Sequence, residues 1–205
     1  GPEWLISDKS LWPKTPLIAA STELEARTKE VICTLHLIAP AGIIQKFSSL
    51  TKVLRVMAYC LRFVNNARGS RKHVSTSVVL SPEELDDAMM LCVKSVQSEC
   101  FAADIHDLSL PNGTLKRSSK LVTLHPFLDP TGILRVGGRL HNSQISYNSK
   151  HPMLLPARHH FTTLVYWHEH ARMLHAPPQQ LVSEVRQKFW PLRARQMATK
   201  IMNRC

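Results

Sequence analysis

The C-terminal stretch of the chain, residues 160–205, reads HFTTLVYWHEHARMLHAPPQQLVSEVRQKFWPLRARQMATKIMNRC. Its prolines divide it into three predicted helices, because proline suits the first turn of a helix and interrupts its interior. The first spans residues 160–173, Pro177-Pro178 starts a second that runs to about Phe189, and Pro191 opens a third. The apolar core of three such helices is thin, and a chain of fewer than about 50 residues usually needs a metal or a partner to fold.

Two histidines and a cysteine in this stretch are of the residue types that bind zinc. His168 lies on the first predicted helix, His175 in the turn after it, and Cys205 at the end of the third. A structural zinc site takes four imidazole or thiolate ligands in a tetrahedron. A second cysteine three positions after Cys205 would complete such a set. His170 is a competing ligand, since it lies on the same helix as His168.

Residues 111–156 have the pattern of a small β module. Short strand-like runs occupy residues 121–124 and 133–136, and the sequence Asp129-Pro130-Thr131-Gly132 between them is typical of a tight turn. Gly137-Gly138 predicts a bulge or a close approach of two backbone segments. The module is too short to be a complete enzyme domain.

Two longer helices are predicted before this module. Apolar residues recur at alternating steps of four and three over residues 43–66, which is the period of an amphipathic helix. A second helix starts at Ser81-Pro82-Glu83-Glu84, where Ser81 caps, Pro82 takes the first helical position and Glu84 completes a capping box. Cys92 and Cys100 lie on its apolar face, so we expect both to be buried as small hydrophobic side chains.

These patterns predict an α+β fold that is mainly helical. Three parts are expected: a connecting region with the amphipathic helix (1–80), a capped helix with the small β module (81–156), and a three-helix zinc module (157–205). The length of 205 residues suits one or two domains, and the five widely spaced cysteines argue against a secreted disulfide framework. No apolar run reaches the roughly 18 residues that span a membrane, so no membrane partner is expected.

The charge is strongly positive and unevenly distributed. The chain has 26 Lys and Arg against 15 Asp and Glu, a formal net charge of +11. Residues 81–110 hold seven acidic groups and one basic group, whereas residues 111–205 hold 14 basic groups and three acidic ones. A basic C-terminal half favours a polyanionic partner, most plausibly a nucleic acid.

The most specific run of the chain is HPFLDPTGILRVGGRL at residues 125–140, followed by Lys150-His151-Pro152 and Leu154-Leu155-Pro156. It resembles the polyprotein of BEL/Pao-type long-terminal-repeat retrotransposons, in the region that joins RNase H to integrase. Residues 47–63 and 80–101 resemble the family's linker helices. The final run, with His168, His175, Phe189-Trp190 and Cys205, resembles the His-His-Cys-Cys zinc module at the N-terminus of integrase, ending before its last cysteine.

The resemblance implies a structural Zn²⁺ ion held by His168, His175 and Cys205, in a fragment that lacks the integrase catalytic core and is therefore not an enzyme. The implied partners are element-end DNA, other integrase subunits and the rest of the polyprotein. The implied setting is intracellular, in a cytoplasmic particle and in the nucleus. The candidate DNA contacts on the basic face of the module are Arg186, Lys188, Arg193, Arg195, Lys200 and Arg204.

Two positions depart from the family pattern, Pro177 in place of glycine and Leu181 in place of threonine. Glycine permits backbone angles that proline forbids, so the turn around His175 is expected to differ.

Two other functions are compatible with the residues. One is a metal-free helical domain that binds proteins. The other is a zinc hydrolase with Glu169 as the base, although Arg172 stands where a helix-borne protease motif needs its second histidine.

Overall fold

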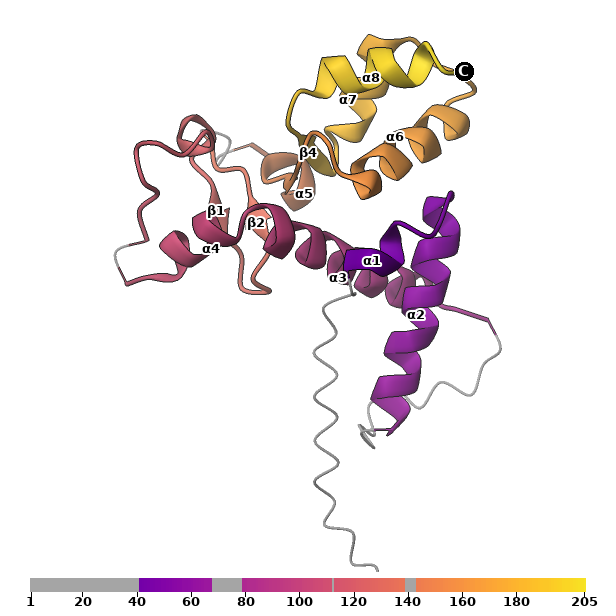
Figure 1. The fold of residues 1–205 in the computed structure, drawn as a ribbon, viewed down its shortest axis with the longest axis horizontal. Coiled ribbons are helices and arrows are strands. Elements are labelled where there is room, and N and C mark those ends of the chain that lie inside the picture. Colours follow the sequence, from indigo (N-terminus) through magenta and orange to yellow (C-terminus); the bar gives the residue numbers. More distant parts are fainter. Residues whose placement is uncertain (1–40, 68–78, 112, 139–142) are drawn as a thin grey trace, which may run out of the picture. The chain divides into compact units, whose positions relative to one another are not determined.

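The predicted amphipathic helix is divided into two helices in the computed structural model, which describes residues 41–67, 79–111, 113–138 and 143–205 (Figure 1). Helix α1 (Ala41–Ile44) ends in a turn, and helix α2 (Leu50–Ala67) begins after Ser49. The Ser49 carbonyl accepts a hydrogen bond from the Val53 amide, at 3.2 Å. A single helix over 43–66 is therefore wrong: α1 ends at Ile44, and α2 starts again after Ser49, a residue type that is favoured immediately before a helix. The first 40 residues of the predicted connecting region lie outside the described residues.

Helix α3 (Pro82–Cys100) starts with the predicted capping box. The Glu84 amide donates to Ser81 Oγ at 3.3 Å, and the Ser81 amide donates to the Glu84 carboxylate at 2.8 Å. Cys92 is fully buried, and burial raises the pKa of its thiol to about 12. The expected burial of Cys100 is wrong, because α3 ends there and the chain turns at Phe101 into helix α4 (Ala102–Ser109), which leaves the thiol exposed.

Four short strands form one sheet in the order β1-β2-β3-β4. Strands β1 (Phe127–Leu128), β2 (Leu134–Arg135) and β3 (Met153–Leu155) pair antiparallel, and β4 (Phe189–Pro191) pairs parallel with β3. The strand predicted at 121–124 is wrong: a 3-10 helix, η3 (Val122–Leu124), is found there. Its amides bond to nearby carbonyls, as in Leu124 to Leu121 at 2.9 Å, so they do not join the sheet.

The predictions for two glycine positions of the β module, a turn at Gly132 and a close backbone approach at Gly137, are confirmed. Gly132 has a φ of +79° and donates its amide to the Asp129 carbonyl at 2.8 Å, closing the turn between β1 and β2. A Cβ atom added to Gly137 would lie 2.2 Å from the His125 carbonyl oxygen. The predicted close approach of two backbone segments is therefore present at Gly137.

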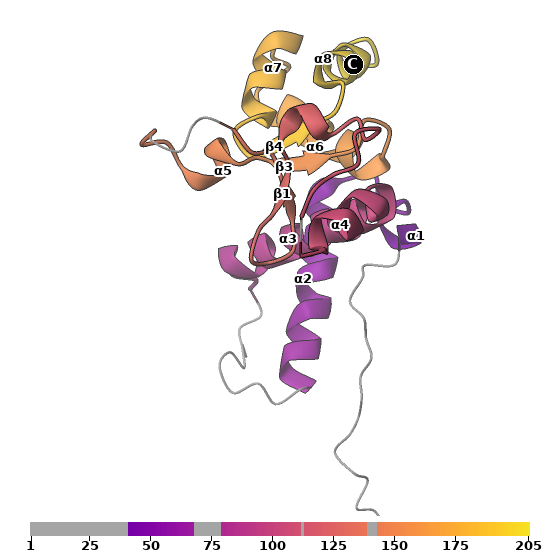
Figure 2. The same ribbon diagram turned by 90° about the vertical axis from the view of Figure 1, so that its left-hand side faces the viewer.

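The C-terminal region contains three helices, α6 (His160–Arg172), α7 (Pro178–Val185) and α8 (Ala194–Met202), preceded by a single turn, α5 (Tyr147–Lys150). The second helix ends four residues earlier than predicted, because residues 189–191 form β4. Figures 1 and 2 show the sheet between these helices on one side and α3 and α4 on the other. Buried residues of α6, α7 and α8 belong to one hydrophobic cluster with those of α2 and α3.

The described residues thus form eight α-helices and one four-stranded sheet, which confirms a mainly helical fold with a small β component. In the described part of the chain, none of the helices combines the length and the hydropathy of a membrane span.

Candidate metal centre

The turn that follows α6 brings two histidines together. His170 lies in the last turn of α6, and the backbone then adopts left-handed angles at Leu174 (φ 53°) and His175 (φ 66°). The His175 amide donates to the His170 carbonyl at 3.0 Å, which fixes the reversal. The two imidazole rings meet edge to face, with their centroids 4.8 Å apart and their planes at 83°.

Cys205 adds a third donor from the end of α8. Its sulfur lies 3.0 Å from Nδ1 of His175, and this nitrogen lies 3.1 Å from Nε2 of His170. All three donor atoms are within 4.8 Å of one another. Figure 1 shows the C-terminus of the chain close to the end of α6. Two imidazole nitrogens and one thiol, from three separate segments, therefore face one point.

His170, and not His168, is the histidine of α6 that belongs to this cluster. Consecutive helical residues are rotated by about 100°, so residues two apart face nearly opposite sides. His168 is exposed, whereas the His170 side chain is 1% exposed. A signal for His170 was present in the sequence, since Thr162, Tyr166 and His170 recur at steps of four and form part of the buried face of α6.

The donor set fits a tetrahedral metal ion. Zn–N distances of about 2.0–2.1 Å and a Zn–S distance of about 2.3 Å place neighbouring donors roughly 3.3–3.6 Å apart. The two separations from Nδ1 of His175, 3.0 and 3.1 Å, lie slightly below this range, and the third pair of donor atoms lies within 4.8 Å, so a bound ion needs small adjustments of the side chains. His175 and Cys205 are exposed, so a fourth ligand can approach from the solvent side. Nδ1 of His170 is buried without a hydrogen-bond partner among the described residues.

The proline at position 177 lies outside the left-handed part of this turn. Pro177 has a φ of −62°, the value that its ring prefers, and precedes the first residue of α7. The left-handed angles fall at Leu174 and His175, two or three residues earlier. Position 177 is thus an extended residue immediately before α7, and its backbone angles do not require glycine.

The three acidic residues of the segment 111–205 are all paired with arginine. Asp129 binds Arg135 at 2.6 Å, and both Glu169 and Glu184 bind Arg172. In the described part of the chain, His170, His175 and Cys205 form the one group of three or more potential metal ligands. Carboxylates thus contribute nothing to this centre.

The six predicted DNA contacts differ in their surroundings. The guanidinium of Arg186 stacks on the Trp190 ring, 4.4 Å from its centroid. Lys188 is bound to Asp86 on α3 at 3.0 Å, so its charge is already partnered. Arg193 has a left-handed φ of 59° immediately before α8. The remaining three are exposed on α8 and after it: Arg195, Lys200 and Arg204.

Comparisons of the chain with protein-family models, with curated proteins and with solved structures find no match. The candidate metal centre therefore rests on its own geometry.

Proposed function

We propose that the chain is a non-catalytic fragment of a BEL/Pao-type retrotransposon polyprotein, with a zinc-stabilised module that supports DNA integration. The observation that carries the proposal is the convergence of His170, His175 and Cys205 on one point. This differs from the set implied by the resemblance in one residue, His170 in place of His168. The order His, His, Cys along the chain is that of the integrase zinc module, which supports the family assignment.

A bound Zn²⁺ would act as a structural cross-link between the end of α6, the following turn and the end of α8. Such an ion contributes folding free energy directly, because its ligands are not assembled in the unfolded chain. The three protein donors leave one position for a cysteine of a longer chain or for water. No catalytic step is assigned to the fragment, whose acidic residues in 111–205 are held by arginines.

Metal binding is tested by titrating the 205-residue chain with Co²⁺ and then displacing it with Zn²⁺. We expect one equivalent of cobalt and the absorption band of a cobalt–thiolate bond. His170→Ala and Cys205→Ser should each weaken binding by about tenfold or more, since each removes a ligand. The matched control is His168→Ala, an exposed histidine two residues away. Equal loss in His168→Ala, or no stoichiometric binding, contradicts the proposed centre.

The proposed partners are element-end DNA, other integrase subunits and the rest of the polyprotein, in the cytoplasmic particle and the nucleus. The excess of basic over acidic residues in 111–205 supports the nucleic-acid partner. Binding through phosphates should weaken steeply as salt rises. A duplex titration at two salt concentrations tests this, and salt-independent binding or none contradicts the DNA role.

One observation favours the second candidate, a helical domain that binds proteins. Helix α2 exposes Val56, Tyr59 and Phe63, whose exposed fractions are 40%, 43% and 70%. Contiguous exposed apolar side chains often mark protein contacts. This second candidate is metal-free, so it is supported by a chain that binds no stoichiometric cobalt and by a Phe63→Ser variant that loses association with a polyprotein fragment.

A further inference from the structure

A groove of about 460 Å³ lies at the start of α8, and two parts of the chain line it. Lys120 and Thr123 come from the segment between α4 and β1, in the β module. Arg186 and residues 190–196 come from the C-terminal region. The groove therefore joins two parts that the sequence patterns place in separate modules.

The lining of the groove is strongly basic. Lys120, Arg186, Arg193 and Arg195 all contribute to it, and no Asp or Glu does. Among the described residues none of these four side chains has an acidic partner within 4.0 Å. Four uncompensated cations around one small concavity repel each other, and a bound anion relieves that repulsion.

Two local features prepare the groove for an anion. The Trp190 ring holds the Arg186 guanidinium by stacking, so less of its freedom is lost on binding. Helix α8 begins at the groove, and its preceding residue, Arg193, provides no side-chain cap. The first amides of α8 therefore keep their capacity to donate to an anion, which the helix dipole also favours.

A second basic groove continues along the exposed face of α8. Its lining starts with Arg195 and Gln196, which the first groove also contains, and extends to Lys200 and Arg204. Again no Asp or Glu lines it. A chain of phosphates fits such a path better than a single small anion does, because positive charge continues beyond the first groove.

We propose that the groove formed by Lys120, Arg186, Arg193 and Arg195 binds a backbone phosphate of a nucleic acid, and that α8 contacts the phosphates that follow. This inference rests on the nucleic-acid partner of the proposed function and is independent of the metal. It adds Lys120, from the β module, to the binding surface. The contacts are to phosphate, so binding is independent of base sequence.

The test compares Lys120→Gln, Arg195→Gln and their double variant with Lys116→Gln in duplex titrations of the full chain. Lys116 is an exposed lysine of the same segment that binds Asp107 outside the groove, so its variant changes the net charge equally. Each groove variant should lower the salt slope of log Kd by about 1 and weaken two unrelated duplexes alike. Lys116→Gln should leave the slope within experimental error of the wild type.

Amide spectra of Ala194 and Gln196 with inorganic phosphate separate the possible anion sources. Shifts with both phosphate and duplex, lost in the double variant, support the proposal. Shifts with phosphate while the duplex leaves these amides unchanged contradict it, and assign the groove to a small phosphorylated ligand. A wild type that binds duplex while Lys120→Gln behaves as Lys116→Gln overturns the groove alone; a wild type that binds no duplex overturns the nucleic-acid role in the proposed function.

Discussion

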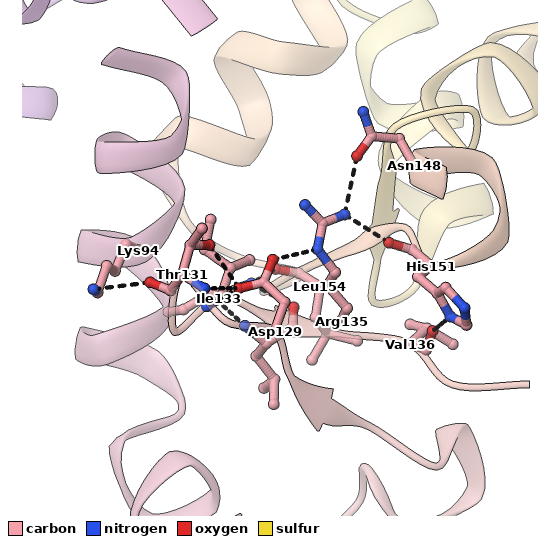
Figure 3. A network of polar contacts seen from close by, with 11 residues as sticks. Lys94, Asp129, Thr131, Ile133, Arg135, Val136, Asn148, His151 and Leu154 are labelled. Carbon is pink, nitrogen blue, oxygen red and sulfur yellow. Dashed lines mark hydrogen bonds and ion pairs between the residues drawn. The ribbon is translucent and has the colours of Figure 1, made fainter. Parts of the chain in front are cut away.

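The carboxylate of Asp129 organises the first turn of the β module (Figure 3). Oδ1 accepts hydrogen bonds from the Thr131 amide, the Thr131 hydroxyl and the Ile133 amide, at 2.6–3.0 Å. Oδ2 accepts one from Arg135 Nε at 2.6 Å, and both side chains are 4% exposed. Burial alone would raise the pKa of Asp129, but the bonds from Thr131, Arg135 and Ile133 together lower it. The ionised form is thus the one that the fold requires.

Replacing this carboxylate should strongly destabilise the protein. We expect Asp129→Asn to lower the free energy of unfolding at pH 7 by about 3–5 kcal/mol, because it leaves the buried Arg135 charge without its acidic partner. The measurement is urea denaturation. Asp86→Asn is the control: it breaks an exposed pair with Lys188, and should cost no more than about 1 kcal/mol.

The pair of Asp129 and Arg135 also predicts how the free energy of unfolding depends on pH. The folded-state pKa of Asp129 is lowered, so its stabilisation is complete above the unfolded value of about 3.9 and is lost as the pH falls through the folded value. The difference between wild type and Asp129→Asn should therefore shrink in acid. A difference that is constant from pH 7 to pH 2 would contradict this role.

Two adjacent glycines provide a further test at the scale of single residues. A Cβ at Gly137 would overlap the His125 carbonyl oxygen, whereas one at Gly138 meets nothing within 4 Å. Gly137→Ala should cost about 1–3 kcal/mol, since the backbone must move apart. Gly138→Ala should change stability by about 0.5 kcal/mol or less. Equal denaturation midpoints for the two variants would show that the backbone at Gly137 can move away from the His125 carbonyl without loss of stability.

The metal ligands show how far single residues can be predicted. His175 and Cys205 follow from residue type and position, because a turn and a helix end bring their side chains back to the preceding helix. The choice between His168 and His170 depends on which face of α6 is buried. That face is set by packing against α7 and α8. The residue types therefore indicate the chemistry, while tertiary packing selects the ligand.

At the scale of elements, Gln97 connects α3 with the sheet. Its amide nitrogen donates to the carbonyls of Leu134 and Leu154 at 2.9 and 2.8 Å, and its oxygen accepts from the Leu134 amide at 2.7 Å. The side chain is fully buried. Gln97 thus provides hydrogen bonds to three backbone groups of β2 and β3. Without it, these groups would be buried against the apolar side chains of the helix.

Removing the hydrogen bonds of Gln97 should weaken the attachment of α3 to the sheet and lower the free energy of unfolding. Gln97→Leu has a similar volume but leaves three buried backbone groups unpaired, at about 1–3 kcal/mol for each. We expect a loss of at least about 3 kcal/mol in urea denaturation. Ser98→Ala, on the exposed side of the same turn, should change stability by about 0.5 kcal/mol or less. A Gln97→Leu variant as stable as the wild type would show that water replaces these bonds.

Elements with strong local signals were the ones predicted correctly. Helix α3 carries its capping box, and α6 extends over residues 160–172, one residue short of the predicted 160–173. Strand β4 was missed because its partner, β3, lies more than 30 residues away, and three residues have no period of their own. The break between α1 and α2 was missed because the apolar pattern continues through it, although α1 ends at Ile44 and α2 starts only after Ser49.

At the scale of the whole molecule, β4 connects the metal centre to the rest of the described chain. It lies between α7 and α8 in sequence, yet pairs with β3 of the β module. The helices around the centre also share a hydrophobic cluster with α2 and α3. Three short helices with a thin core thus gain a partner within the same chain, so a bound metal ion would supplement an existing core.

Because β4 joins the candidate metal centre to the sheet, we predict that metal binding also slows amide hydrogen exchange in the sheet. The Met153 amide donates to the Lys188 carbonyl at 3.0 Å, and the Leu192 amide to the Leu155 carbonyl at 2.9 Å, on the two sides of the β3–β4 pair. If Zn²⁺ stabilises the folded state at saturation, these amides should exchange more slowly by a factor of about 100 at 100 times the Kd, since exchange through unfolding falls with the unfolded population.

Hydrogen exchange with and without Zn²⁺ measures this effect directly. The protection gained at Met153 and Leu192 should persist in His168→Ala and fall by about tenfold or more in His170→Ala at the same Zn²⁺ concentration, because the candidate ligand is on the buried face of α6. Protection confined to α6 and α8, with the two sheet amides unchanged, would contradict the coupling. It would mean that the helices open around the metal without breaking the β3–β4 pair, and that zinc stabilises a local unit only.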